Sequence, residues 1–234
     1  MLPKKESALQ INNPGTAQSA DGIEMTFYTD PLCCWSWAMR PHWQQFLSFL
    51  TVPVNVTYKM AGLLPSWKHF NDTTNAISKP VQMGPEWMHA RGVTGADIQE
   101  KIWVADPPAS SFPACIAVIA AGCQSPVTGQ EYLYQAQLAV MTQCRNVAKR
   151  EVLLDIAARV HAIHPDFDVA AFRKDLLGDK PRDIFRKDMQ EAKFLNITRL
   201  PTIVFRSRRG PATITSGYQT TEMLVAAAKK VSIS

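Results

Sequence analysis

Near the start of the 234-residue chain, residues 25–37 read MTFYTDPLCCWSW. The apolar, β-favouring run at 23–29 predicts a buried strand. An Asp-Pro pair breaks this strand, and Cys33 and Cys34 follow where a helix is expected to begin. A second stretch, residues 198–205, reads TRLPTIVF and predicts another strand that a proline opens. These two segments, far apart along the chain, decide the expected fold.

The hydrophobic pattern between them is mostly helical. Helices are predicted at 34–50, 80–92, 97–103, 111–124, 129–146, 150–163, 169–177, 181–195 and 220–231, and further strands at 52–60 and 213–216. The order is therefore β-α-β, a long run of helices, then β-β-α. This order predicts an α/β fold with a large all-helical insertion. We expect residues 23–62 and 196–234 to form one lobe, 63–195 a helical lobe, and 1–22 a disordered tail.

Composition narrows the class of protein. The chain is 46% hydrophobic and 19% charged, which is typical of a globular domain. A net charge of +5 without basic stretches interleaved with aromatic residues argues against a nucleic-acid partner. No apolar run is long enough to cross a membrane. The polar N-terminus lacks the apolar core of a signal peptide, so we expect a cytoplasmic protein.

Cysteine and histidine usage points to free thiols and no metal. The chain has five cysteines, an odd number that fits a reducing compartment better than a disulfide framework. His161 and His164 fall at a predicted helix end just before a proline, which favours a capping role over metal ligation. Cys115 and Cys123 lie on one apolar helix and are expected in the core.

Cys33 carries the candidate chemistry. A thiol attacks only as the thiolate, and a helix N-terminus lowers the pKa of a cysteine from about 8.5 because unpaired N–H groups favour the anion. The N–H groups of Trp35 and Ser36 are expected to face its sulfur, and the Ser36 hydroxyl is a further donor. Cys34 is either a small residue that fills the turn or a second thiol, and both readings stay open.

Three segments resemble cytoplasmic DsbA-like proteins of the thioredoxin superfamily, in the branch that includes FrnE-like oxidoreductases. Residues 30–37, DPLCCWSW, resemble their Asp-x-x-Cys-Pro-Trp-Cys-Tyr motif. Residues 107–114, PPASSFPA, resemble the Ser-Ser-x-Pro-Ala segment that opens a helix of their insertion. Residues 200–202, Leu-Pro-Thr, resemble their cis-proline loop. The resemblance covers about residues 23–230 and implies a thioredoxin fold with a helical insertion.

The same resemblance implies thiol–disulfide chemistry, with an incomplete pair of thiols. The second motif cysteine is Ser36 here, so the chain carries a CxxS variant in which Cys33 acts alone or with Cys34. No cofactor is expected, and a mixed disulfide would be resolved by Cys34, by a separate thiol or by glutathione as cosubstrate. Protein thiols or disulfides, or glutathione, are the expected partners. Substrate binding is expected at a small group of residues beside the thiol: Trp35, the Leu200 backbone, Pro201 and Thr202.

Two alternatives share the fold. The kappa-class glutathione transferases and 2-hydroxychromene-2-carboxylate isomerases use a serine at the first motif position, and Cys33 at that position disfavours them. A non-catalytic adaptor, which binds a client protein and delivers it to a protease, would use the same fold for recognition alone.

Overall fold

The sheet is built from both ends of the chain. The computed structural model describes residues 22–51, 54–73, 75–207 and 211–232, so residues 1–21 of the predicted tail lie outside the described residues. In it the strands are β1 (Ile23–Thr29), β2 (Val54–Met60), β3 (Thr202–Arg206) and β4 (Thr213–Ser216).

The four strands lie in the order β2-β1-β3-β4. β1 pairs in parallel with β2, with Phe27 opposite Tyr58, and antiparallel with β3, with Met25 opposite Phe205. β4 completes the sheet antiparallel to β3. The predicted α/β fold with a helical insertion is confirmed, because the two segments quoted at the outset meet as the central pair of one sheet.

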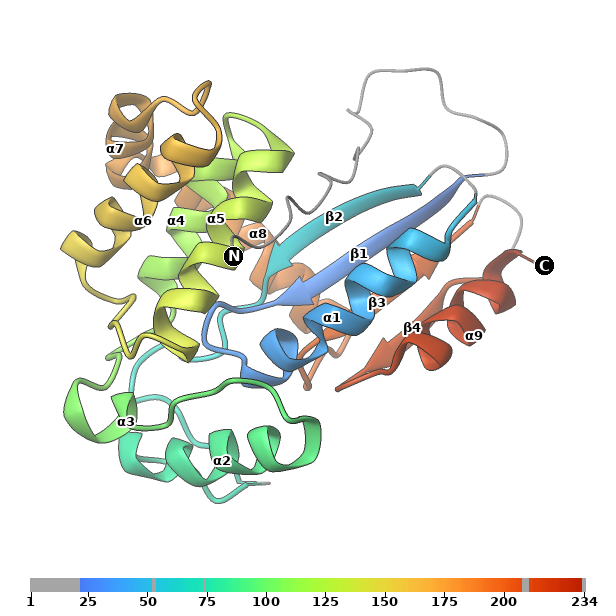
Figure 1. Cartoon of the computed structure of the whole chain (residues 1–234), viewed down its shortest axis with the longest axis horizontal. Coiled ribbons are helices and arrows are strands. Elements are labelled where there is room, and N and C mark those ends of the chain that lie inside the picture. The colour runs from blue at the N-terminus through green and yellow to red at the C-terminus, as the bar shows by residue number, and fades with distance from the viewer. Residues whose placement is uncertain (1–21, 52–53, 74, 208–210, 233–234) are drawn as a thin grey trace, which may run out of the picture.

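Alternation along β1 divides its side chains between two layers. Ile23, Met25 and Phe27 pack against helices α1 (Cys34–Phe49) and α9 (Thr221–Ser232). Figure 1 shows these two helices on one side of the sheet. On the opposite face, Tyr28 and Val204 pack against Ala192 of α8 (Asp179–Phe194). The sheet is therefore covered by helices on both faces.

The inserted helices form a second core. They are a 3₁₀ turn (Pro80–Gln82), α2 (Met83–Thr94), α3 (Ile102–Ala105), α4 (Phe112–Gly122), α5 (Pro126–Met141), α6 (Arg150–Ile163), α7 (Val169–Leu177) and α8. Helices α4 to α8 gather at one end of the sheet, and α2 and α3 lie beside them (Figure 1). Helices α4 and α5 approach closely at two glycines, because a Cβ on Gly129 would lie 2.7 Å from the Cα of Gly122.

Two predicted helices differ from the structure by more than the end residues. The helix expected at 97–103 forms only from Ile102, because the N–H of Gln99 donates to the carbonyl of Met141 at 2.6 Å and holds this segment outside a helix. The helix expected at 129–146 begins three residues earlier, where the hydroxyl of Ser125 caps it. It ends at Met141, and the chain then turns through Cys144 with a φ of 50°. Tertiary contacts and caps set these ends.

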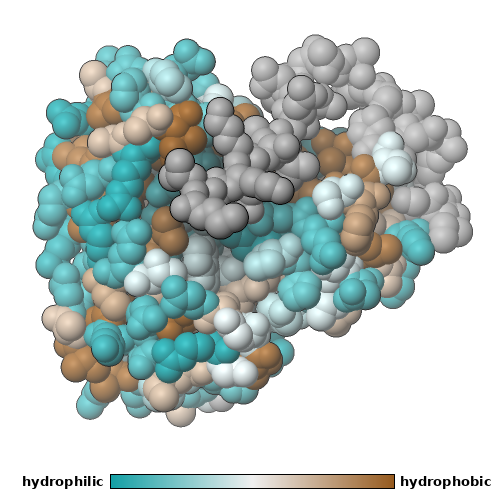
Figure 2. Space-filling view, in the orientation of Figure 1, coloured by the Kyte–Doolittle hydropathy of each residue, from teal (hydrophilic) through white to brown (hydrophobic). Residues whose placement is uncertain are grey.

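The exposed surface is mixed in character. Figure 2 shows polar residues over most of the face in view, with apolar residues in scattered patches. In the part of the chain that the structure describes, no helix is long and apolar enough to cross a bilayer. Among the same residues, no group of three His, Cys, Asp or Glu side chains is placed to hold a metal ion.

The outer edge of β2 is tied to α8 by a buried carboxyl. The N–H of Ala61 donates to Thr29 of β1, whereas the N–H of Met60 points the other way and donates to Oδ2 of Asp188 at 3.2 Å. Asp188 is 8% exposed. Burial raises the pKa of Asp188 to about 6, while the Met60 hydrogen bond and the charge of Lys59 oppose the rise.

Asp188→Asn is expected to stabilise the protein at neutral pH. A carboxyl whose pKa is raised from 3.8 to about 6 favours the folded state below the lower value, and that contribution is lost as the pH rises through the higher one. The amide keeps an oxygen for Met60 and carries no charge, so the gain is up to about 3 kcal/mol. Urea unfolding at about pH 7.5 and about pH 3 measures it, and the gain should vanish at the lower pH, which lies below both pKa values.

Asp183→Asn is the matched control, because Asp183 lies on the same helix and is exposed. A difference between Asp188→Asn and the wild type that is the same at both pH values would contradict this reading of the buried carboxyl.

Candidate active site

Cys33 caps the first helix. Its backbone is extended, with φ −80° and ψ 104°, and its Sγ accepts a hydrogen bond from the N–H of Ser36 at 3.4 Å. The N–H of Cys33 donates to the carbonyl of Asp30 at 3.0 Å, which closes the turn that follows β1. The sulfur therefore lies at the N-terminus of α1, as the sequence predicts.

The turn is held by the buried carboxylate of Asp30. Its two oxygens accept hydrogen bonds from Leu32 N–H at 2.8 Å and Leu63 N–H at 2.7 Å. They also accept from the hydroxyl of Ser111 at 2.7 Å and the thiol of Cys115 at 3.3 Å. Burial raises the pKa of Asp30, and the hydrogen bonds from Leu32, Ser111, Leu63 and Cys115 oppose that rise.

The segment before β3 faces this turn. The peptide bond between Leu200 and Pro201 is cis. The carbonyl of Pro201 accepts from the N–H of Gly217 at 2.8 Å, and the hydroxyl of Thr202 donates to the carbonyl of Arg199 at 2.6 Å. Thr202 is buried, so its hydroxyl holds the backbone of this loop and does not reach the cavity described below.

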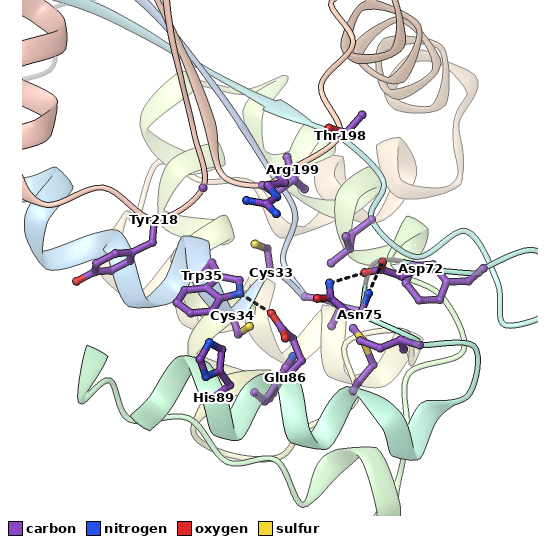
Figure 3. Close-up of a pocket in the computed structure, with 18 residues that line it drawn as sticks. Cys33, Cys34, Trp35, Asp72, Asn75, Glu86, His89, Thr198, Arg199 and Tyr218 are labelled. Atoms are coloured by element: carbon purple, nitrogen blue, oxygen red, sulfur yellow. Dashed lines mark hydrogen bonds between the residues drawn. The ribbon is translucent and has the colours of Figure 1, made fainter. Parts of the chain in front are cut away.

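A cavity of about 420 Å³ joins the two segments. Of the predicted site residues, Cys33, Cys34, Trp35 and Leu200 line it, whereas Ser36, Pro201 and Thr202 lie behind its wall. The walls also include Asp72, from the polar loop at 62–80 that the sequence suggests as a cover for a site, and five further residues that the sequence predictions missed: Asn75, Glu86, His89, Arg199 and Tyr218. Figure 3 shows them arranged around the two cysteines. Arg199 directly precedes the Leu-Pro-Thr loop, and Tyr218 follows β4, whereas nothing in the sequence marks Glu86 or His89.

Trp35 is fixed at the mouth of the cavity. Its Nε1 donates to Oε1 of Glu86 at 2.7 Å. Its ring centroid lies 5.6 Å from that of His89 and 6.1 Å from that of Tyr218, both in edge-on geometry. In contrast, Trp37 stacks on Tyr134 and does not line the cavity. Trp35 thus connects the start of α1 to helix α2.

The two adjacent cysteines have different surroundings. Both are 4% exposed and neither is in a disulfide. Cys34 belongs to the core of the helical lobe, with Met83 and Trp87 in the same cluster. In Figure 3 the Cys34 sulfur is directed toward α2, whereas the Cys33 sulfur is directed toward the Arg199 side of the cavity.

The expected activation of Cys33 is outweighed by burial. Burial raises the pKa of Cys33 to about 11. The Ser36 hydroxyl and N–H and the Trp35 N–H lower it, whereas the charge of Asp30 raises it. The prediction that the helix N-terminus lowers this pKa is therefore wrong for the resting protein: the amides act in the predicted direction, but loss of water around the thiol is the larger effect. The Ser36 hydroxyl, although close enough to favour the thiolate, has no hydrogen-bond partner of regular geometry among the described residues.

A helix-capping cysteine, a facing cis-proline loop and a helical insertion together define a DsbA-like protein of the thioredoxin fold. A thioredoxin family model, Thioredoxin_5, matches residues 27–226, and the chain belongs to this family.

Curated relatives are similar over most of this chain. One is the ClpXP adapter protein SpxH of Halalkalibacterium halodurans, 25% identical over 183 residues, which are 78% of this chain and 58% of the relative. The protein of the same name from Bacillus thuringiensis subsp. konkukian is 24% identical over 206 residues, which are 86% of this chain and 65% of the relative. The chain thus spans less than two thirds of the length of these relatives.

Solved structures show the same fold. A proposed protein disulfide isomerase from Nitrosomonas europaea has a TM-score of 0.73 at 18% identity, over 89% of this chain and 97% of the other. The cytosolic disulfide reductase DsbM from Pseudomonas aeruginosa has a TM-score of 0.67 at 18% identity, over 90% and 100% of the two chains. DsbM has also been solved with GSH, and that structure has a TM-score of 0.63.

The pH dependence of Cys33 alkylation is expected to follow the raised pKa. In Cys34→Ala, the rate at Cys33, followed by peptide mass spectrometry, should rise about tenfold per pH unit from about pH 7 to 10, because only the thiolate reacts. The same protein unfolded in urea is the control, and its rate should level off near the ordinary thiol pKa of about 8.5. A plateau below that value in the folded protein would contradict the dominance of burial.

Proposed function

We propose that the protein is a DsbA-like thiol–disulfide oxidoreductase that acts through Cys33 alone and uses glutathione as its cosubstrate. The observation that carries the proposal is one cavity that holds the Cys33 sulfur at a helix N-terminus and the Leu200 segment before a cis-proline. The fold shared with a disulfide reductase, DsbM, that has been solved with GSH supports the choice of cosubstrate.

The proposed cycle needs a single protein thiol. The Cys33 thiolate attacks the glutathione sulfur of a mixed disulfide, so that a new bond joins Cys33 to glutathione while the old S–S bond breaks. The released thiolate takes up a proton and leaves. A second glutathione thiolate then attacks the glutathione sulfur on Cys33, releasing glutathione disulfide and restoring the Cys33 thiolate. In total, the mixed disulfide and one glutathione thiol become the free substrate thiol and one molecule of glutathione disulfide.

Two neighbours of Cys33 have roles in this proposal. At a pKa of about 11, on the order of one molecule in ten thousand carries the thiolate near pH 7. The Ser36 hydroxyl has no partner in the resting protein, and a hydroxyl can rotate its proton toward an anion. In this proposal it donates a hydrogen bond to the Cys33 thiolate when that forms. The backbone of Leu200 is half-buried at the cavity wall, where an extended substrate segment pairs with it in the manner of an added strand.

Cys34 takes no part in the proposed cycle. Its side chain packs in the helical core, and burial raises its pKa well above the ordinary value. Cys34→Ala should therefore still form a mixed disulfide when incubated with glutathione disulfide, whereas Cys33→Ser should form none at this site. Intact-protein mass spectrometry followed by peptide mapping distinguishes the two. An adduct on Cys34, or unchanged adduct formation in Cys33→Ser, would contradict a mechanism that relies on Cys33 alone.

Ser36→Cys is the companion variant. It supplies the second thiol that the related motif contains, three residues along the first turn of α1 from Cys33. After the same incubation this variant should lose its glutathione adduct and end as an internal disulfide, two hydrogens lighter than the reduced protein. The wild type should retain the adduct until reduced glutathione is added.

A second candidate function rests on the curated relatives, which are named ClpXP adapter proteins. An adapter role requires a binding surface but no reactive thiol. Under this hypothesis, purified ClpXP binds the chain and its Cys33→Ala variant with the same affinity, which fluorescence anisotropy of labelled protein can measure. Absence of binding at about 50 µM, far above a specific dissociation constant, would reject it.

A further inference from the structure

Among the described residues, one arginine lines the cavity beside Cys33, and its guanidinium has no partner there. Of the described residues that line it, Arg199 alone is a lysine or arginine. Arg199 is exposed, and no ion pair or hydrogen bond joins its guanidinium to any residue in the described ranges. In Figure 3 its side chain extends from the loop before β3 into the space above the Cys33 sulfur.

The backbone that carries Arg199 is firmly positioned. Its carbonyl accepts the hydroxyl of Thr202 at 2.6 Å, and that hydroxyl lies 3.0 Å from the hydroxyl of Ser216 on β4. The carbonyl of Pro201, two residues further on, is bound by Gly217. The backbone of Arg199 is therefore held in place while its guanidinium has no partner among the described residues. Arg199 is next to Leu200, whose backbone is proposed to bind substrate.

The acidic residues of the cavity are engaged elsewhere. Glu86 accepts the indole N–H of Trp35 at 2.7 Å. Asp72 accepts the side-chain amide of Asn75 at 2.8 Å and its backbone N–H at 3.1 Å. These carboxylates sit on α2 and on the loop before it, whereas Arg199 lies on the opposite, β3 side. The negative charges of the cavity therefore lie on the α2 side, and its positive charge lies on the β3 side at Arg199.

We propose that Arg199 binds a carboxylate of the disulfide that reacts with Cys33, and so selects anionic disulfides of the glutathione class over neutral ones. The inference rests on the proposed oxidoreductase function and names the substrate class of the same site. A guanidinium binds a carboxylate through two parallel hydrogen bonds, which fixes orientation as well as charge. Glutathione carries a carboxylate at each end, and the Cys33 sulfur at which it would react is directed toward the Arg199 side of the cavity.

Disulfide exchange with two reagents tests the selection. Glutathione disulfide is anionic, and bis(2-hydroxyethyl) disulfide has no charge. In the wild type, the rate of adduct formation at Cys33 should favour the anionic reagent, and in Arg199→Gln that preference should fall about tenfold while the rate with the neutral reagent stays unchanged. Arg199→Glu should lower the preference further. Arg173→Gln, which removes an exposed arginine on α7 remote from the cavity, should behave as the wild type.

Binding of S-methylglutathione separates this inference from the proposed chemistry, because that ligand cannot exchange. Calorimetry should detect binding to the wild type and to Arg173→Gln, and about tenfold weaker binding to Arg199→Gln. Equal binding to all three proteins, or none to the wild type, would overturn the role of Arg199. A third outcome is that S-methylglutathione binds the wild type and loses affinity in Arg199→Gln while glutathione disulfide forms no adduct at Cys33. That result would overturn the oxidoreductase function and leave the carboxylate site standing.

Discussion

The hydrogen-bonded carboxylate of Asp30 is the contact on which the rest of the structure depends. It lies at the end of β1 and is completely buried, yet it accepts from the Cys33 turn, from the loop after β2 and from the start of α4. One side chain thereby fixes the candidate nucleophile, the cavity wall and the helical lobe relative to one another. Its removal would leave several buried donors without an acceptor, each at a cost of about 1–3 kcal/mol. The aspartate of the Asp-x-x-Cys motif therefore holds the parts of the fold together, in addition to placing the candidate nucleophile.

The parts of the fold that local sequence patterns encode were predicted from the sequence. The strand before Cys33, the proline-opened strand β3 and helices such as α6 and α7 were predictable because periodicity and breakers mark them. The α3 segment and the end of α5 were not, because a hydrogen bond between Gln99 and Met141 decides both and their separation hides it. The site divides in the same way. Cys33, Trp35 and Leu200 belong to short motifs, whereas Glu86 reaches the cavity only through the packing of α2.

At Cys33, burial by the rest of the fold outweighs the effect of the helix N-terminus on the pKa of the thiol. The helix N-terminus supplies the N–H groups that favour a thiolate, as the sequence predicts. Packing around the turn leaves Cys33 only 4% exposed, and the loss of hydration at its sulfur outweighs the helix. In this class of site, thiol reactivity is controlled as much by what lies over the sulfur as by the turn that presents it.

The central position of β1 has a consequence for synthesis. Its two neighbours are β2, which follows almost at once, and β3, which lies beyond the whole helical insertion. On the ribosome, one edge of β1 therefore stays open while α2 to α8 are made, and its apolar face lacks the cover of α9. This edge and this apolar face are covered only once β3 and α9 have been made. A truncated transcript that ends within the helices would yield an aggregating fragment, although it contains every residue of the Cys33 turn.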